Sequence, residues 1–265
     1  MRRYRFILLI FFLVYAVSIA VPNLVYICVD GASRDTFFAL IQKDALPTFK
    51  QMMGQGNYRK MVADQSLSYT QRYQVLMGMG HESDQNQETL FDRIKQVYPS
   101  SQISLLFSYH DSDSDQLNTM DIALSDYLDI SLYQQRNTFQ IASYMKNFIN
   151  RNPDPFVLMV NFPEPAFIAS RFREGCYEYS LAIKNIDKAL ASVIKLLKTK
   201  QLFDNTIFVI TTDRGVQKRS QLFNQYTWIL ASFKSYKEGS INEVVPSILF
   251  EYGIEDLNFD PLQVL

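Results

Sequence analysis

The stretch Asn205-Thr206-Ile207-Phe208-Val209-Ile210-Thr211-Thr212-Asp213-Arg214-Gly215 decides the fold of this chain. Its apolar run at 207–210 is β-branched and aromatic, which predicts a strand buried on both faces. A second stretch near the start, Val25-Tyr26-Ile27-Cys28-Val29-Asp30-Gly31, has the same design. The chain therefore carries two aspartates, Asp30 and Asp213, each placed where a buried strand gives way to a glycine turn.

Similar apolar runs alternate along the chain with segments of helical periodicity. Strands are predicted at 24–29, 103–107, 156–160, 207–210 and 226–231. Helices are predicted at 35–41, 89–97, 138–150, 177–198 and 244–252, and the polar, turn-rich stretch 108–137 is predicted to be an irregular insertion. This alternation indicates an α/β fold, a three-layer α/β/α sandwich with a mostly parallel central sheet.

Length and composition favour one folded domain. The chain has 265 residues, of which 48% are apolar and 20% charged, enough to bury a substantial core. Its net charge of −1 and pI near 6.1 argue against general binding of nucleic acids, because no basic surplus is present to neutralise phosphates. We expect a single domain at 21–265, preceded by a separate segment at 1–20.

The first twenty residues have the features of a secretory signal. Arg2, Arg3 and Arg5 precede an uncharged run at 6–20, and Ser18-Ile19-Ala20 offers the small residues that a signal peptidase recognises. The run is shorter than the roughly twenty residues of a membrane span. We therefore expect the domain to be secreted or otherwise outside the cytoplasm, with an uncleaved membrane anchor as the alternative.

The two aspartates are the first candidate site residues. Each one taken singly has an ordinary explanation, since an aspartate after a strand often caps the next helix. Taken as a pair, they predict two carboxylates that face one point, because ligands of an open parallel sheet bind at the carboxyl ends of its strands. Two like charges so close together need a cation beside them.

Three further segments complete a pattern. The segment 68–78 reads Ser68-Tyr69-Thr70-Gln71-Arg72-Tyr73-Gln74-Val75-Leu76-Met77-Gly78. The opening turn continues as Gly31-Ala32-Ser33-Arg34-Asp35 and then Leu46-Pro47-Thr48-Phe49, and the last helix reads Glu243-Val244-Val245-Pro246-Ser247-Ile248-Leu249. With the two aspartate turns, these segments resemble the alkaline phosphatase superfamily, whose branches include phosphodiesterases and sulfatases.

The resemblance implies roles for particular residues. Ser68 falls on the nucleophile, at a helix N-terminus that would hold an anionic ester group, although an ordinary N-cap serine suits the same place. Asp30 and Asp213 fall on metal ligands that are retained. The other ligand positions fall on residues that are not ligands in that family, namely Ala166, Ser170, Arg214 and Gln221. The chain holds only two histidines, His81 and His110, fewer than the family's metal site uses.

These losses imply a catalytically impaired domain that acts in binding or scaffolding and needs no cofactor. Arg214, helped by Arg72, is predicted to bridge the two aspartates in the metal's place and to bind anions. The expected partner is a phosphate- or sulfate-bearing ligand or a protein. The alternative is a phosphate- or sulfate-ester hydrolase with a reduced zinc or calcium site and Ser68 as its nucleophile, and a sulfatase-like calcium site would add Gln221 or Asn161 to the aspartates.

The mature chain is expected to begin at Val21. The first predicted strand begins only at about Asn23, so cleavage after Ala20 removes nothing that the fold needs. N-terminal sequencing of the secreted protein checks this expectation, and an intact Met1 recovered from a membrane fraction would show an anchor instead.

Overall fold

The structure is a computed structural model that describes residues 21–55, 57–62, 73, 75–78, 88–108, 129–133, 137–152, 155–213, 226–233 and 239–254. The predicted signal segment at 1–20 lies outside these ranges. No helix within them is long and apolar enough to cross a membrane.

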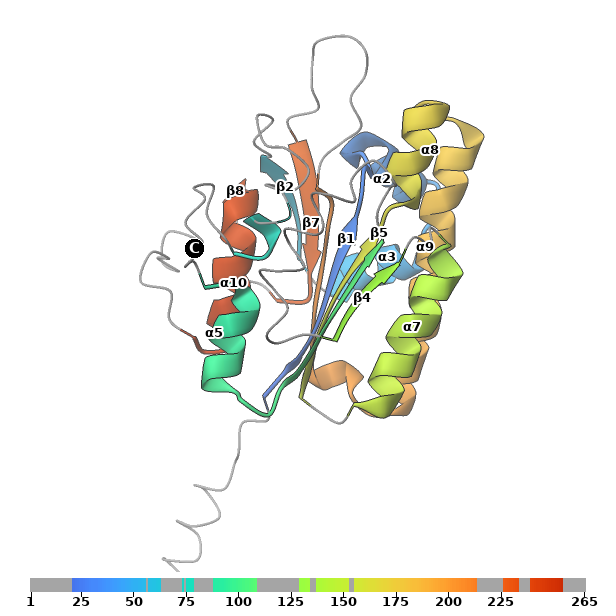
Figure 1. Ribbon diagram of the computed structural model, residues 1–265. Helices are drawn as coiled ribbons and strands as arrows, with labels where there is room; N and C mark the ends of the chain where they lie inside the picture. The colour runs from blue at the N-terminus through green and yellow to red at the C-terminus, as the bar shows by residue number, and fades with distance from the viewer. Residues whose placement is uncertain are drawn as a thin grey trace, which may run out of the picture.

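The described strands form one eight-stranded sheet in the order β4-β3-β5-β1-β6-β7-β2-β8 (Figure 1). Neighbouring strands run parallel except β7, which is antiparallel to both β6 and β2. The bounds are β1 (Asn23–Val29), β2 (Asn57–Val62), β3 (Gln102–Ser108), β4 (Asp129–Tyr133), β5 (Phe156–Phe162), β6 (Thr206–Thr211), β7 (Tyr226–Ala231) and β8 (Gly239–Ser240). The sheet is mostly parallel, as predicted.

Helices cover both faces of the sheet (Figure 1). One face carries α2 (Arg34–Gln42), α3 (Pro47–Gln55), α7 (Thr138–Arg151), α8 (Glu164–Arg171) and α9 (Tyr177–Thr199). The other face carries α5 (Leu90–Val97) and α10 (Val244–Glu251), and two 3-10 turns lie at Phe203–Asn205 and Ile241–Glu243. This arrangement confirms the predicted three-layer sandwich.

The central strand β1 belongs to both hydrophobic cores. Leu24, Tyr26 and Cys28 face the core under α5 and α10, whereas Val25 and Ile27 face the core under the other helices. All of these residues are buried because alternate side chains of a strand point to opposite faces and both faces are covered. A continuous apolar run is therefore the pattern that this position in the sheet demands.

Some described elements were not predicted from the sequence. The helices α3 and α8 and the strand β2 were missed, and β4 lies inside the stretch 108–137 that was predicted to be irregular. That prediction was wrong for 129–133, where the backbone pairs in parallel with β3. Short elements of this kind depend on partners far away in the sequence, which local periodicity does not report.

The first turn of helix α3 is stabilised by such a distant residue. The buried carboxylate of Asp187, in the middle of α9, accepts hydrogen bonds from the backbone N–H groups of Phe49 at 2.8 Å and Thr48 at 3.2 Å. These donors belong to the first turn of α3, which has no helical acceptor for them. Burial raises the pKa of Asp187, and the two backbone N–H groups oppose that rise. The side chain therefore caps α3 and joins it to α9.

Replacing Asp187 by alanine should lower the free energy of unfolding by about 2 kcal/mol, because two buried N–H groups lose their acceptor. Urea denaturation of the purified protein measures the change. Asp204→Ala, at an exposed position of the 203–205 turn, is the matched control and should change stability by less than about 0.5 kcal/mol. Equal effects of the two substitutions would contradict the capping role.

Candidate functional site

The register of the parallel strands brings Asp30 and Asp213 together. Cys28 on β1 lies opposite Thr211 on β6, and each aspartate follows two residues later. Since residues two apart on a strand share a face, both aspartates leave the sheet at the same level and on the same side. They are 2% and 3% exposed, so neither charge has access to much water.

A tight turn joins the two aspartates. The backbone N–H of Gly31 donates to Asp213 Oδ1 at 2.9 Å, while the N–H of Asp30 donates to the carbonyl of Phe162 on β5 at 3.0 Å. Gly31 has a φ of +67°, and a Cβ there would lie 2.8 Å from the Cα of Ala166. Only glycine fits this turn. The position predicted to have lost a metal ligand, Ala166, therefore packs directly against the turn between the two aspartates.

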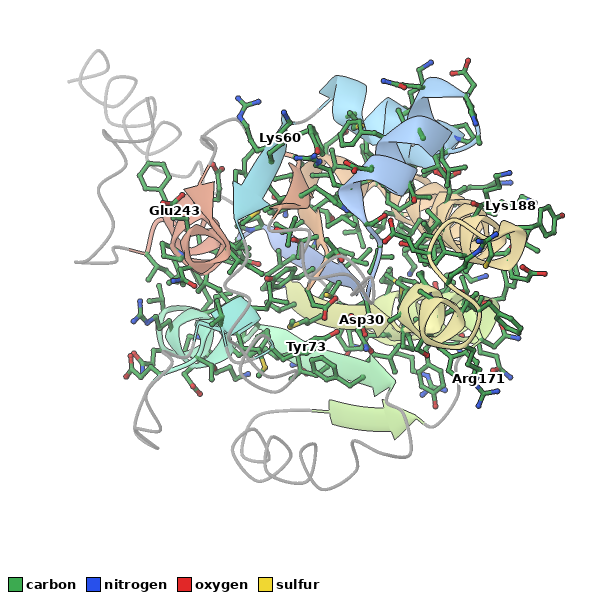
Figure 2. The ribbon with its side chains drawn as sticks, turned by 90° about the horizontal axis from the view of Figure 1, so that it is seen from above. Asp30, Lys60, Tyr73, Arg171, Lys188 and Glu243 are labelled. Atoms are coloured by element: carbon green, nitrogen blue, oxygen red, sulfur yellow. The ribbon has the colours of Figure 1, made fainter. Side chains whose placement is uncertain are left out.

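Both oxygens of Asp30 accept hydrogen bonds from neutral side chains. The hydroxyl of Tyr73 donates to Oδ1, and Nδ2 of Asn161 on β5 donates to Oδ2 at 2.8 Å. Figure 2 shows Tyr73 and Asp30 beside each other when the sheet is viewed from above. The first donor comes from the helical residues at 73 and 75–76, and the second comes from the neighbouring strand. Three separate parts of the chain thus meet at one carboxyl group.

Burial dominates the electrostatics of this site. Burial raises the pKa of Asp30, the charge of Asp213 adds to the rise, and the bonds from Tyr73, Asn161 and Cys28 oppose it, which leaves the pKa at about 7. Burial also raises the pKa of the Cys28 thiol well above its ordinary value, with the charges of Asp30 and Asp213 adding to that effect. Cys28 therefore stays a neutral thiol, and Asp30 is in part a neutral acid at pH 7.

The hydroxyl of Tyr179 clamps the same turn from the α9 side. It donates to the carbonyl of Gly31 at 2.6 Å and accepts from the backbone N–H of Ser33 at 2.8 Å. Burial raises the pKa of Tyr179 to about 12, so the hydroxyl keeps its proton and can fill both roles. Contacts from α8, through Ala166, and from α9, through Tyr179, thereby fix the conformation of the turn.

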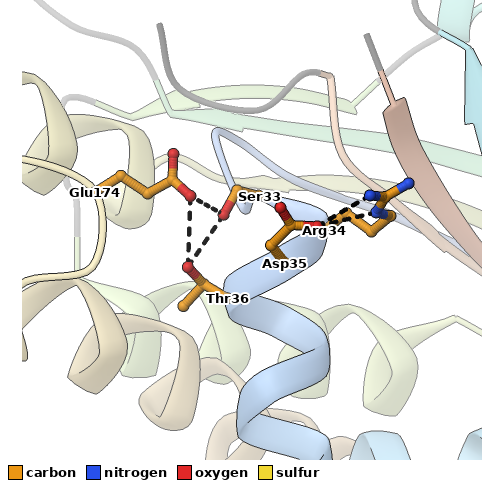
Figure 3. A network of polar contacts seen from close by, with 5 residues as sticks. All are labelled: Ser33, Arg34, Asp35, Thr36 and Glu174. Carbon is orange, nitrogen blue, oxygen red and sulfur yellow. Dashed lines mark hydrogen bonds and ion pairs between the residues drawn. The ribbon is translucent and has the colours of Figure 1, made fainter. Parts of the chain in front are cut away.

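A polar network at the start of α2 continues outward from Ser33 (Figure 3). The Ser33 hydroxyl donates to the Glu174 carboxylate, and the Thr36 hydroxyl lies 3.1 Å from Ser33 Oγ and 3.4 Å from the same carboxylate oxygen. Glu174 belongs to the connection between α8 and α9, where Arg173 has a φ of 147° and Gly175 a φ of 81°. This connection is thus tied to the N-terminus of α2, next to an exposed ion pair of Arg34 and Asp35.

Several residues singled out in the sequence lie outside the described part of the chain. They are Ser68, Arg72, His81, His110, Arg214 and Gln221. Ala166 and Ser170 are described, and both lie on α8, a helix that was not predicted from the sequence. Ser170 is exposed and its hydroxyl donates to the carbonyl of Phe167 at 2.8 Å, so it contributes nothing to the buried aspartates.

Tyr73 was not predicted as a site residue, and Asn161 was predicted only as a further ligand of a sulfatase-like calcium site, not as a hydrogen-bond donor to Asp30. One signal in the sequence pointed to Asn161, because an amide inside a fully buried strand is costly unless it is hydrogen-bonded. Asn161 is the only polar residue of β5 and is fully buried. Tyr73 carried no such signal, since a tyrosine among apolar neighbours is ordinary core material.

The described residues do not fit a metal centre of the kind the resemblance implies. Among them, no group of three or more His, Cys, Asp or Glu side chains could hold a metal ion. A zinc site in proteins uses three or four protein ligands, and calcium takes six to eight oxygens. Asp30 and Asp213 supply two carboxylates, Ala166 has no donor atom, and both oxygens of Asp30 already accept hydrogen bonds.

Comparison with solved structures shows the fold. Lipoteichoic acid synthase LtaP from Listeria monocytogenes matches with a TM-score of 0.65 and 11% identity, over 90% of this chain and 73% of its own. A protein of the alkaline phosphatase superfamily from Vibrio parahaemolyticus matches with a TM-score of 0.67 and 14% identity, over 89% and 67%. A 2-O GAG sulfatase matches with a TM-score of 0.63 and 14% identity, over 89% and 72%.

No family model and no curated protein matches the sequence. At identities of 11–14%, the structural matches establish the fold. The chain has the alkaline-phosphatase-like fold that sulfatases share, as the residues of its two aspartate turns predicted.

The raised pKa of Asp30 predicts a pH-dependent stability. The pKa of Asp30 is near 4 in the unfolded chain and about 7 in the folded protein. The stability that this carboxyl contributes is therefore fully present below about pH 4 and is lost as the pH rises through about 7. The shift corresponds to a loss on the order of 4 kcal/mol. Asp30→Asn removes this titration while keeping both bonds, because the amide oxygen accepts from Asn161 and the amide N–H donates to the Tyr73 hydroxyl oxygen.

Relative to the wild type, Asp30→Asn should therefore gain stability as the pH rises from 4 to 8. Chemical denaturation at a series of pH values measures the difference in free energy of unfolding. Gln140→Ala, which removes no titratable group from an exposed position on α7, is the control and should show a difference that does not change with pH. A constant difference for Asp30→Asn as well would contradict the burial of an acidic group with a raised pKa.

Proposed function

We propose, from its alkaline-phosphatase-like fold and the residues at the strand ends, that this chain is a catalytically impaired domain that acts in binding or scaffolding outside the cytoplasm. One observation carries the proposal. At the place where the resemblance puts the metal ions, the described side chains include two carboxylates, one of which accepts hydrogen bonds from Tyr73 and Asn161. A domain of this kind needs no cofactor.

The ligand that suits such a domain is a phosphate- or sulfate-bearing molecule or a protein that displays one. The proposal rests on Arg72 and Arg214, which the resemblance puts around the former nucleophile position Ser68. Guanidinium groups bind phosphate and sulfate oxygens in pairs of hydrogen bonds. The net charge of −1 disfavours nucleic acids as partners.

A location outside the cytoplasm rests on the N-terminal segment. Its three arginines, uncharged run and small residues before Val21 are those of a secretory signal. If the segment is not cleaved, the same residues would tether the domain to a membrane.

A metal-dependent hydrolase is the second candidate, and one observation favours it. Asp30 and Asp213 lie together at the carboxyl ends of adjacent strands, as a site that uses both of them requires. In that case Ser68 is the nucleophile, and zinc or calcium bound by the aspartates would lower the pKa of its hydroxyl. Additional ligands would then have to come from outside the described residues.

Metal content and ester hydrolysis separate the two candidates. Full-length protein purified without chelator should hold zinc and calcium well below one equivalent by elemental analysis. It should cleave an aryl phosphate, an aryl phosphodiester and an aryl sulfate no faster than Ser68→Ala does. Stoichiometric metal together with turnover that Ser68→Ala abolishes would establish the hydrolase and refute the binding role.

A further inference from the structure

Asn161 occupies an unusual place in the sheet. It is the penultimate residue of β5, whose other six residues are apolar, and it lies opposite Cys28 in the parallel register with β1. That register puts its side chain on the face from which Asp30 leaves the sheet, two residues beyond Cys28. The amide reaches Asp30 Oδ2 at 2.8 Å. A buried amide inside an apolar strand thus serves as a hydrogen-bond donor to Asp30.

Tyr73 reaches the other oxygen from a different direction. Its side chain is fully buried, and its ring packs edge-on against Phe107 of β3 with centroids 5.2 Å apart. This contact fixes the ring, so the hydroxyl is directed at Asp30 Oδ1. Asp30 is therefore held by neutral donors, the Tyr73 hydroxyl and the Asn161 amide, with a further bond from the Cys28 thiol.

Neutral hydrogen-bond donors and a metal ion are alternative means of stabilising a buried carboxylate. A carboxylate pair in a buried site needs positive charge or the positive ends of dipoles. The amide and hydroxyl provide such dipoles without adding charge, whereas a cation would have to displace them or coordinate around them. The side chains next to Asp30, and not the aspartates themselves, then decide which of the two arrangements the site adopts.

We propose that Asn161 and Tyr73 are the residues that make this carboxylate pair independent of metal, and that Asn161→Asp alone converts it into a site for a divalent cation. The inference deepens the proposed function, on which it rests. The substitution preserves the shape of the side chain but puts an acceptor where Nδ2 now donates to Asp30. Three carboxylates at one point supply the oxygen ligands that Ca²⁺ and Mg²⁺ take.

Thermal unfolding in chelator and in millimolar Ca²⁺ tests the proposal. The wild type should melt at the same temperature in both. Asn161→Asp should melt about 5–10 °C lower in chelator and recover most of that loss in Ca²⁺. Asn147→Asp, which adds the same charge at an exposed position of α7, should respond to neither. An Asn161→Asp protein that melts like the wild type in chelator, or that Ca²⁺ does not restore, overturns the inference.

Tyr73→Phe provides a second test should Asn161→Asp fail to fold. It leaves Asp30 Oδ1 without its donor but keeps the ring contact with Phe107, so it should lower Tm in chelator and regain part of it in Ca²⁺. A Tyr73→Phe protein that melts like the wild type in both conditions refutes the proposal. A wild type whose own Tm rises in Ca²⁺ would refute the proposed metal-free function together with this inference, whereas failure of the variants alone refutes only the inference.

Discussion

The structure around the strand ends depends on one constraint, the burial of the Asp30 carboxyl group. At 2% exposure its oxygens cannot rely on water, and an unsatisfied buried carboxylate costs several kcal/mol. Tyr73 and Asn161 meet that requirement from two different elements. The position of β5 beside β1 and the approach of the helical residues near Tyr73 are therefore linked to a single side chain.

The turn at Asp30 and Gly31 connects the buried carboxyl group to the helices on the other face of the sheet. Gly31 binds Asp213 through its N–H and Tyr179 through its carbonyl, and its missing side chain leaves room for Ala166. Tyr179 belongs to the long helix α9, which also caps α3 through Asp187. The indole N–H of Trp228 on β7 donates to the carbonyl of Ala32 at 2.9 Å, so the turn also contacts the antiparallel part of the sheet.

Much of the architecture could be predicted from the sequence because its strong signals are local. The apolar runs of β1, β5 and β6 predicted strands buried on both faces. The helical periodicity at 177–198 predicted α9, whose buried face includes Ile186, Leu190, Val193 and Leu197. The pairing of Asp30 with Asp213 also followed from local pattern, because both residues end parallel strands of the same sheet.

The partners of Asp30 were not predictable in the same way. The predicted charged partner of the carboxylates, Arg214, lies outside the described residues and stays a prediction, whereas the donors that the described residues supply to Asp30 are neutral. Those donors lie 43 and 131 residues away along the chain. The helix that carries Ala166 and Ser170 was missed for a related reason, since its place is defined by the contact of Ala166 with Gly31.

The proposed function requires that hydrogen bonds from Tyr73 and Asn161, and not a metal ion, hold the Asp30 carboxyl. A crystal structure of the full chain grown in millimolar zinc and calcium, with anomalous diffraction recorded at the zinc edge, tests it most directly. We expect hydrogen bonds from Tyr73 and Asn161 to Asp30 and no anomalous peak at the strand ends. A zinc ion about 2.0–2.2 Å from oxygens of Asp30 and Asp213, with the Tyr73 hydroxyl displaced, would contradict it.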